Sequence, residues 1–236
     1  MNNQSLIQIK DVWKKYDMGE ADPLIVLKEI NLDIQPNEFV AITGPSGSGK
    51  STMMNIVGAL DRPSWGSISL KGKDISEMSE STLAFLRGKT IGFIFQQFNL
   101  IRNLTAMENV MLPMEMIGTP EKSAKERAYK LLDMFGLADR LHHRPTQLSG
   151  GQQQRVAIAR ALANDPEVIL ADEPTGNLDS QTGKFVMDFL GKMHNEGKTV
   201  ILITHDLNLV TYAKKIVYIK DGRIEKEVHN KKGGKK

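Results

Sequence analysis

The sequence contains no cysteine and no long hydrophobic run, and both absences exclude whole classes of protein. Without cysteine the chain can form no disulfide and carry out no thiol chemistry, which suits a reducing cytoplasm. The longest stretch free of Asp, Glu, Lys and Arg is the twelve residues 90–101, and a membrane-spanning helix needs about 18. The N-terminus shows no apolar stretch after a basic one, so no secretory signal is expected. We expect a cytoplasmic protein; if it acts at a membrane, another protein must cross the bilayer.

An excess of charge of one sign is also missing from the body of the chain. The 31 Lys and Arg outnumber the 28 Asp and Glu, but four of the lysines stand in the last six residues, KKGGKK. Removing these four leaves 27 basic residues against 28 acidic ones, so the basic pI of about 8.9 comes from the tail, residues 230–236. We therefore expect no nucleic-acid partner. The flexible tail is either a solubilising end or a contact for anionic lipid.

The 236 residues fit one large domain, residues 1–229, with strands at both ends of the chain. Apolar patterns predict early strands, then a helix, at Ile7–Trp13, Leu24–Ile34, Glu38–Thr43 and Lys50–Leu60. Continuous apolar runs at Val168–Ala171 and Val200–Thr204 are typical of strands buried in a parallel sheet, with Ser180–Asn195 as the crossover helix between them. A hairpin closes the chain, Ile216–Lys220 and Arg223–Val228 flanking an Asp-Gly turn.

The middle of the chain has a different periodicity. From about Asn103 to Ala163 apolar residues recur three and four apart, most regularly in Lys125–Met134 and Gln152–Leu162. This pattern predicts a helical lobe, about 98–163, inserted into a core made of about 1–97 and 164–229. The fold class we expect is α/β: a P-loop core sheet with an antiparallel β layer and the helical lobe.

The segment GPSGSGKST matches the phosphate-binding pattern G-x-x-x-x-G-K-[ST] and stands between a predicted strand and a predicted helix. Its residues are Gly44, Pro45, Ser46, Gly47, Ser48, Gly49, Lys50, Ser51 and Thr52. The glycines let backbone N–H groups surround a polyphosphate, to which the following helix adds its positive end. We expect Lys50 to reach the β and γ phosphates, Ser51 to ligate Mg²⁺ and Thr52 to bind near the α-phosphate.

Two carboxylates follow a later apolar strand, in VILADEP at 168–174. A P-loop needs such an acid at the end of a neighbouring strand, and Asp172 is placed to hold Mg²⁺ through a water. Glu173 comes next and is placed to polarise the attacking water as a general base. The pair predicts hydrolysis rather than binding alone.

The segment LSGGQQQRVAIARALA at 148–163 resembles the LSGGQ signature of ATP-binding cassette (ABC) ATPases. Its opening residues are Ser149, Gly150, Gly151 and Gln152, and Ser149 with Gln152 also forms the pattern of a helix capping box. A capped helix end binds anions, and two glycines allow a phosphate of another chain to approach closely. The resemblance extends over about residues 7–228 and implies ATP and Mg²⁺ as ligands.

The resemblance assigns further residues one by one. Tyr16 matches the aromatic residue that stacks on adenine, and Gln96 matches the glutamine that touches Mg²⁺ or water. Asp179 matches the D-loop aspartate, although Asn177 stands where other members often have Ala. His205 matches the switch histidine, which contacts the γ-phosphate and orients the water together with Glu173. By the same resemblance Lys50, Gln96, Glu173 and His205 are the catalytic residues.

The resemblance also implies partners. Two copies would form a homodimer around two ATP, each bound between one P-loop and Ser149 and Gly151 of the other copy. An integral membrane permease on a separate chain would dock near Arg102, Asn103 and Glu108, and a periplasmic or surface component would act through it. The run FNLIRNLTAMENVMLP at 98–113 is similar to the macrolide-exporter and lipoprotein-releasing group, which includes antimicrobial-peptide export. A cell-division ATPase that regulates wall hydrolases and an importer ATPase remain open alternatives.

Overall fold

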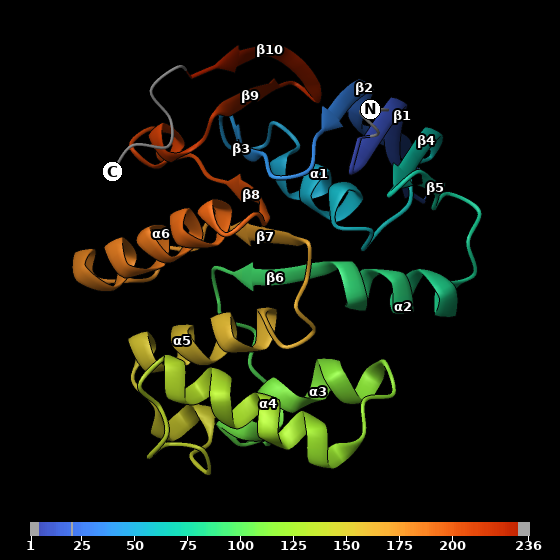
Figure 1. Cartoon of the computed structure of the whole chain (residues 1–236). Coiled ribbons are helices and arrows are strands. Elements are labelled where there is room, and N and C mark those ends of the chain that lie inside the picture. Colours follow the sequence, from blue (N-terminus) through green and yellow to red (C-terminus); the bar gives the residue numbers. More distant parts are fainter. Residues whose placement is uncertain (1–4, 20, 231–236) are drawn as a thin grey trace. The chain divides into compact units, whose positions relative to one another are not determined.

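A computed structural model describes residues 5–19 and 21–230, which form two compact units (Figure 1). The first unit comprises residues 1–83 and 189–236, and the second comprises residues 84–188. The lobe boundaries expected near 98 and 163 differ from this division and stay a prediction. The basic tail lies outside the described residues except for Asn230. Among the described residues no helix combines the length and the apolar composition needed to cross a bilayer.

The first unit is rich in strands. Its elements are β1 (Ile7–Met18), β2 (Ala21–Ile34), β3 (Phe39–Thr43), α1 (Lys50–Val57), β4 (Trp65–Leu70), β5 (Lys73–Asp74), β8 (Thr199–Ile203), a 3-10 turn (Leu209–Tyr212), β9 (Lys215–Lys220) and β10 (Arg223–His229). The second unit contains β6 (Ile91–Phe95), α3 (Ala106–Met116), α4 (Glu121–Met134), a 3-10 turn (Pro145–Gln147), α5 (Gly150–Ala161) and β7 (Val168–Asp172). Helices α2 (Glu80–Thr90) and α6 (Ser180–Asn195) contribute residues to both units.

One sheet of the first unit is the predicted antiparallel layer, with strand order β2-β1-β4-β5. In β1 Ile7 and Ile9 point into the core, the register then shifts, and Val12 is the next residue that is buried. The strands are longer than predicted, because β1 continues to pair with β2 as far as Met18. Tyr16 consequently lies within a paired strand, directly opposite Leu24.

The other strands of the first unit follow the order β10-β9-β3-β8. Strand β3 is parallel to both β8 and β9, and all five residues of β3 and of β8 are buried, as expected for a parallel sheet. Strands β9 and β10 form the predicted closing hairpin. Its turn residues Asp221 and Gly222 both have positive φ, 48° and 77°, which is the two-residue hairpin geometry that Asp-Gly favours.

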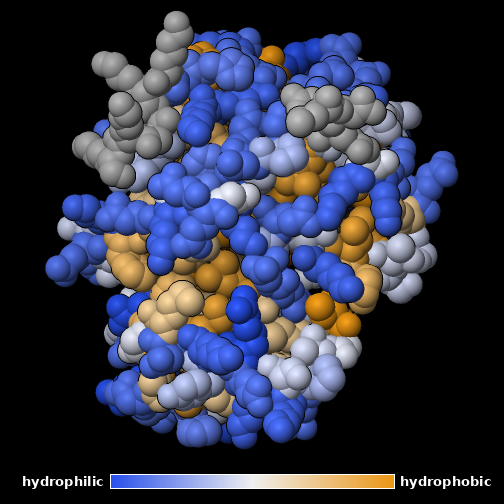
Figure 2. Space-filling model, viewed as in Figure 1, coloured by the Kyte–Doolittle hydropathy of each residue, from blue (hydrophilic) through white to orange (hydrophobic). Residues whose placement is uncertain are grey.

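The second unit combines the parallel pair β6 and β7 with three helices that pack on one another, α3, α4 and α5. Leu131 and Leu132 of α4 and Val156 and Ile158 of α5 are almost completely buried. Burial of each such side chain stabilises the fold by about 1.5–3 kcal/mol. Figure 2 shows a largely hydrophilic face with separate hydrophobic patches, and Met116 of α3 is the most exposed of the large apolar side chains described, at 76%.

Some boundaries and elements differ from the sequence predictions. Helix α1 ends at Val57 rather than at Leu60, because Gly58 closes the helix and Ala59 has a left-handed φ of 53°. Strand β4 and helix α2 were not predicted. In β4 the apolar alternation covers only Ile68 and Leu70, and the apolar face of α2 is weak, since only Leu83 among its first residues is buried.

Candidate functional site

The loop 44–49 joins the buried strand β3 to α1, in the context that the sequence predicts. Gly47 and Gly49 have φ values of 75° and 102°, a region that side chains other than glycine disfavour. Gly44 is fixed by space instead, since a Cβ atom there would lie 2.0 Å from the carbonyl oxygen of Ile219 in β9. Glycine is therefore required in this loop for two reasons: the backbone is left-handed at two positions and lies against β9 at a third.

The side chain of Lys50 is bonded to the backbone at the start of the loop. Its Nζ donates hydrogen bonds to the carbonyl oxygens of Gly44, at 2.9 Å, and Pro45, at 2.8 Å. Helix α1 has no acidic residue in its first turn, so its positive end is not neutralised by its own side chains. The hydroxyl of Ser48 is buried and has no hydrogen-bond partner within the described residues. These donors fit a polyphosphate.

Contacts from the end of the chain hold this loop. The N–H of Gly222 donates to the carbonyl oxygen of Ser48 at 3.1 Å, and the N–H of Lys28 donates to that of Gly222 at 2.8 Å. The β9–β10 turn is thus bonded to β2 and to the phosphate loop at once. His205, the predicted switch residue, follows β8 in the same unit and is exposed.

In the second unit β7 ends at Asp172, which pairs with Phe95 of β6. Because the two strands are parallel, Gln96 and Glu173 leave the sheet at the same edge. Glu173 has a left-handed φ of 44°, uncommon for a residue with a side chain, and its carbonyl oxygen accepts the N–H of Gly176 at 3.0 Å. A tight turn therefore follows the predicted general base at once.

Gln96 packs against that turn. The side-chain amide of Asn177 donates to the main-chain oxygen of Gln96 at 3.1 Å. A Cβ atom on Gly176 would lie 2.7 Å from Nε2 of Gln96. The side chain of Gln96 therefore packs directly against the backbone of Gly176, where a larger residue would not fit. The structure brings together Gln96 and the segment after Glu173, within the second unit.

The signature segment forms the predicted capping box at the start of α5. Ser149 Oγ accepts the N–H of Gln152 at 3.3 Å, and Gln152 Oε1 accepts the N–H of Ser149 at 2.9 Å. Gly150 is exposed and has open space where a side chain would begin. Ser149 and Gly150 therefore present an uncovered helix N-terminus.

Asp179 caps α6 and lies near this helix end. Its carboxylate accepts the N–H of Thr182 at 2.9 Å, the Thr182 hydroxyl at 2.7 Å and the N–H of Gln181 at 3.0 Å. These bonds, first of all that from the backbone of Thr182, hold the pKa of Asp179 below its usual value. Thr182 Oγ1 lies 3.3 Å from the position of a Cβ atom on Gly151. Thr182, which sequence reasoning missed, connects the two motifs.

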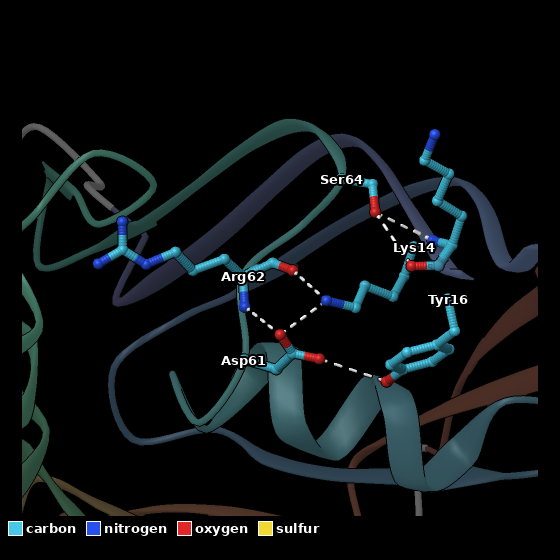
Figure 3. Close-up of polar contacts among 6 residues, drawn as sticks. Lys14, Tyr16, Asp61, Arg62 and Ser64 are labelled. Carbon is cyan, nitrogen blue, oxygen red and sulfur yellow. Dashed lines mark hydrogen bonds and ion pairs between the residues drawn. The ribbon is translucent and has the colours of Figure 1, made fainter. Parts of the chain in front are cut away.

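Tyr16 is half-buried on β1, and its hydroxyl donates to Asp61 Oδ2 at 3.3 Å (Figure 3). Asp61 follows α1 in a segment without any recognisable motif, so sequence reasoning missed it as well. The first unit thus holds Tyr16, the loop 44–52 and His205. The second unit holds Gln96, the signature residues, Asp172, Glu173 and Asp179.

Comparisons with known proteins point to one family. A family model described as "ABC transporter" matches residues 27–176. An uncharacterized ABC transporter ATP-binding protein from Thermotoga maritima is 53% identical over 222 residues, which are 94% of each chain. The macrolide export ATP-binding/permease protein MacB from Hyphomonas neptunium is 49% identical over 226 residues, 96% of this chain but 35% of that protein.

Solved structures agree with the family model. The dimeric structure of MJ0796, described as a bacterial ABC transporter cassette, has a TM-score of 0.87 and 49% identity, and the match covers 94% of this chain and 98% of that one. A dimeric post-hydrolysis state of the ATP-binding cassette MJ0796, bound to ADP and Pi, also has a TM-score of 0.87, with 47% identity. The likeness covers nearly the whole fold.

Proposed function

Because this chain belongs to the ABC transporter family of ATP-binding proteins, we propose that it binds and hydrolyses ATP with Mg²⁺ to drive a separate membrane permease. The observation that carries the proposal is the loop 44–52. There Lys50, two left-handed glycines and the uncapped start of α1 provide donors of the kind a polyphosphate requires. The unpartnered hydroxyl of Ser48 supports it.

Each residue has a role in the proposed reaction. Lys50 binds the β and γ phosphates, and Ser51, Gln96 and Asp172 hold Mg²⁺, which when bound neutralises charge on the phosphates. Glu173 accepts the proton of the attacking water as a general base, and His205 orients that water. The left-handed backbone at Glu173 fixes the direction in which its carboxylate leaves the strand.

We propose a homodimer in which Ser149 and Gly151 of one copy face the phosphate loop of the other. The exposed N-terminus of α5 supports this, since no acidic residue stands in its first turn and its positive dipole is available to an anion from another chain. MJ0796, at 49% identity, is described as dimeric. Asp179 and Thr182 lie beside this helix end and belong to the same surface.

The permease would meet the segment after Gln96, at Arg102, Asn103 and Glu108, and place the chain peripherally on the inner face of the cell membrane. Buried Asn109 orders this segment: Oδ1 accepts the N–H of Ile101 at 2.8 Å, and Nδ2 donates to the oxygens of Ile101, Leu104 and Thr105. The side chain of Glu108 is engaged in capping α3, which leaves Arg102 and Asn103 as the exposed residues without such a role. The likeness to MacB favours an exporter of macrolides, lipoproteins or antimicrobial peptides.

The hydrolysis proposal is tested with Glu173→Gln. We expect calorimetry with Mg-ATP to give wild-type affinity, while phosphate release falls by about 10² to 10⁴ because a positioned base is lost. The matched control is Glu167→Gln, the same change before β7 rather than after it. Near-normal phosphate release from Glu173→Gln would contradict the assignment of the base.

The partner proposal is tested with the same variant. Size-exclusion chromatography should show a dimer with Mg-ATP and a monomer without it. A detergent pull-down with Mg-ATP, followed by mass spectrometry, should then recover a permease with a large extracytoplasmic domain. Recovery of a substrate-binding protein instead would favour an importer, and recovery of wall-hydrolase regulators would favour a cell-division role.

A further inference from the structure

A compact polar cluster lies next to Tyr16 and is not accounted for by the proposed reaction (Figure 3). At its centre Asp61 Oδ1 accepts Lys14 Nζ at 2.7 Å and the N–H of Arg62 at 2.7 Å. Its second oxygen, Oδ2, accepts the hydroxyl of Tyr16 at 3.3 Å. Lys14 Nζ also donates to the carbonyl oxygen of Arg62 at 2.9 Å. Both carboxylate oxygens of Asp61 are therefore engaged, one of them by the tyrosine.

Asp61 is a charged group that its neighbours keep charged. Burial opposes ionisation of this carboxyl, but the hydrogen bonds from Lys14 and Arg62 outweigh burial and hold its pKa below the usual value. The side chain of Lys14 is 12% exposed and that of Asp61 is 30% exposed. A partly buried ion pair of this kind keeps its geometry better than an exposed one, because both partners are packed.

Lys14 also lies against the ring of Tyr16. Its Nζ is over the ring, 5.1 Å from the centroid, within the range of a cation–π contact. The hydroxyl is held by Asp61 and one face by Lys14, so both contacts fix the orientation of the ring, which is half-buried.

The strand register adds an apolar neighbour and connects the ring with the phosphate loop. Tyr16 pairs with Leu24, so their side chains lie on the same face of the β1–β2 hairpin, and Leu24 is 53% exposed. Val26, two residues further along β2, lies where the β1–β2 register shifts, since Lys15 pairs with Ile25 but Lys14 pairs with Leu27. A Cβ atom on Gly49 would be 3.1 Å from the carbonyl oxygen of Val26 and 3.6 Å from its Cγ1. A short path along one strand thus leads from the ring to the loop.

We infer that Asp61 and Lys14 are positioning residues for the nucleobase: they fix the ring of Tyr16 so that the face opposite Lys14, with Leu24 beside it, stacks on adenine. The inference rests on the proposed function, which supplies the nucleotide. Stacking is worth more when the aromatic ring is already oriented, because binding then does not have to immobilise it. Asp61 and Lys14 act through the ring of Tyr16, so their contribution is confined to ligands that carry a base.

The test separates base from phosphate. Asp61→Ala, Tyr16→Phe and wild-type protein are titrated by calorimetry with Mg-ATP and with Mg-tripolyphosphate, which has no base. We expect Asp61→Ala to weaken ATP binding about 5- to 20-fold, a part of the loss typical for removal of a stacking side chain, and to leave tripolyphosphate unchanged. Tyr16→Phe keeps the ring and its contact with Lys14 and loses only the long hydrogen bond to the Asp61 carboxylate, so a smaller loss, about 2- to 5-fold, is expected for ATP alone.

The matched control is Asp33→Ala, the same change at the end of the β1–β2 hairpin that is far from Tyr16, where the carboxylate accepts bonds from Ser5 and Gln8. It should leave both affinities unchanged. If Asp61→Ala does not fold, Lys14→Met, which retains the aliphatic stem, answers the same question. Unchanged ATP binding in Asp61→Ala and Tyr16→Phe, or equal losses for both ligands, would overturn the inference. Wild-type protein that binds neither ligand would instead overturn the proposed function.

Discussion

The side-chain amide of Asn177 donates a hydrogen bond to the main-chain oxygen of Gln96, at 3.1 Å. The two residues are 81 positions apart in the chain and belong to different motifs. Other members of the family often carry Ala where Asn177 stands, and Ala could not make this bond. In this chain the segment between Glu173 and Asp179 is therefore bonded directly to the residue that we propose as a magnesium ligand.

Asn177→Ala tests this connection. We expect turnover to fall by about 2- to 10-fold, as for the loss of one neutral hydrogen bond, since Gln96 is then held less firmly beside the turn. ATP affinity should stay at the wild-type value, because Asn177 is not among the residues that we propose to bind the nucleotide. Steady-state phosphate release and calorimetry give the two quantities. Asn195→Ala, on the exposed end of α6, is the control, and an equal loss of turnover there would contradict the prediction.

Gly44→Ala should destabilise the protein and abolish nucleotide binding. The added Cβ would stand 2.0 Å from the carbonyl oxygen of Ile219, so β9 or the loop must move, at a cost of about 1–3 kcal/mol or more. Chemical denaturation measures the change in the free energy of unfolding. The control is Gly191→Ala in α6, which meets no atom within 4 Å and should stabilise the protein by up to about 1 kcal/mol. Equal effects of the two substitutions would refute the steric argument.

Two capping boxes allow stability to be separated from function. Ser149 with Gln152 caps α5, and Thr105 with Glu108 caps α3 by the same bonds. Ser149→Ala and Thr105→Ala should each lower the free energy of unfolding by about 1 kcal/mol. Only Ser149→Ala should also reduce the turnover of the dimer, since Ser149 is proposed to face the other copy's nucleotide. Thr105→Ala with an equally reduced turnover would show that capping alone explains the effect.

His194 should make stability depend on pH near neutrality. Its ring is buried edge-on against Phe39, and burial, followed by the positive charge of Lys214, lowers its pKa. The unfolded chain, with a histidine pKa of about 6.5, then binds the proton more readily than the folded chain. The contribution of His194 to the free energy of unfolding is therefore fully present above the unfolded pKa. It is lost as the pH falls from the unfolded pKa through the lower pKa of the folded state. Thermal melts from pH 8 to pH 5 should show a flatter decline for His194→Phe; parallel declines would rule out His194 as the source.

The phosphate loop that we propose could be predicted because its residues follow one another in a local pattern. A strand, a glycine-rich loop and a helix follow one another between Phe39 and Val57, and the chemistry of Lys50 is visible in that order alone. The closing hairpin was predicted as well, since an Asp-Gly pair favours positive φ at both positions of a two-residue turn, as found at Asp221 and Gly222.

The supporting residues could not be predicted, because their roles depend on neighbours that are distant in sequence. Asp61 acts on Tyr16 across 45 positions, and only the pairing of β1 with β4 and the end of α1 brings it there. Thr182 looks like any polar residue in the first turn of a helix until its hydroxyl is seen between Asp179 and Gly151. Nor did hydropathy reveal β4, whose pairing with β1 stabilises a strand with a weak apolar pattern.

The hydrogen bonds between the phosphate loop and the β9–β10 hairpin also determine when, during synthesis of the chain, the loop can adopt its final structure. Synthesis proceeds from the N-terminus, so residues 44–52 leave the ribosome long before Ile219 and Gly222, which enclose Gly44 and bond to Ser48. A nascent chain that ends before β9 contains the whole sequence of the loop but lacks Ile219 and Gly222, the residues that contact Gly44 and Ser48. Contacts over such a separation form late in folding, since closing a long loop costs entropy first. The capacity to bind nucleotide is therefore acquired only after β9 and Gly222 have been made, long after the loop itself.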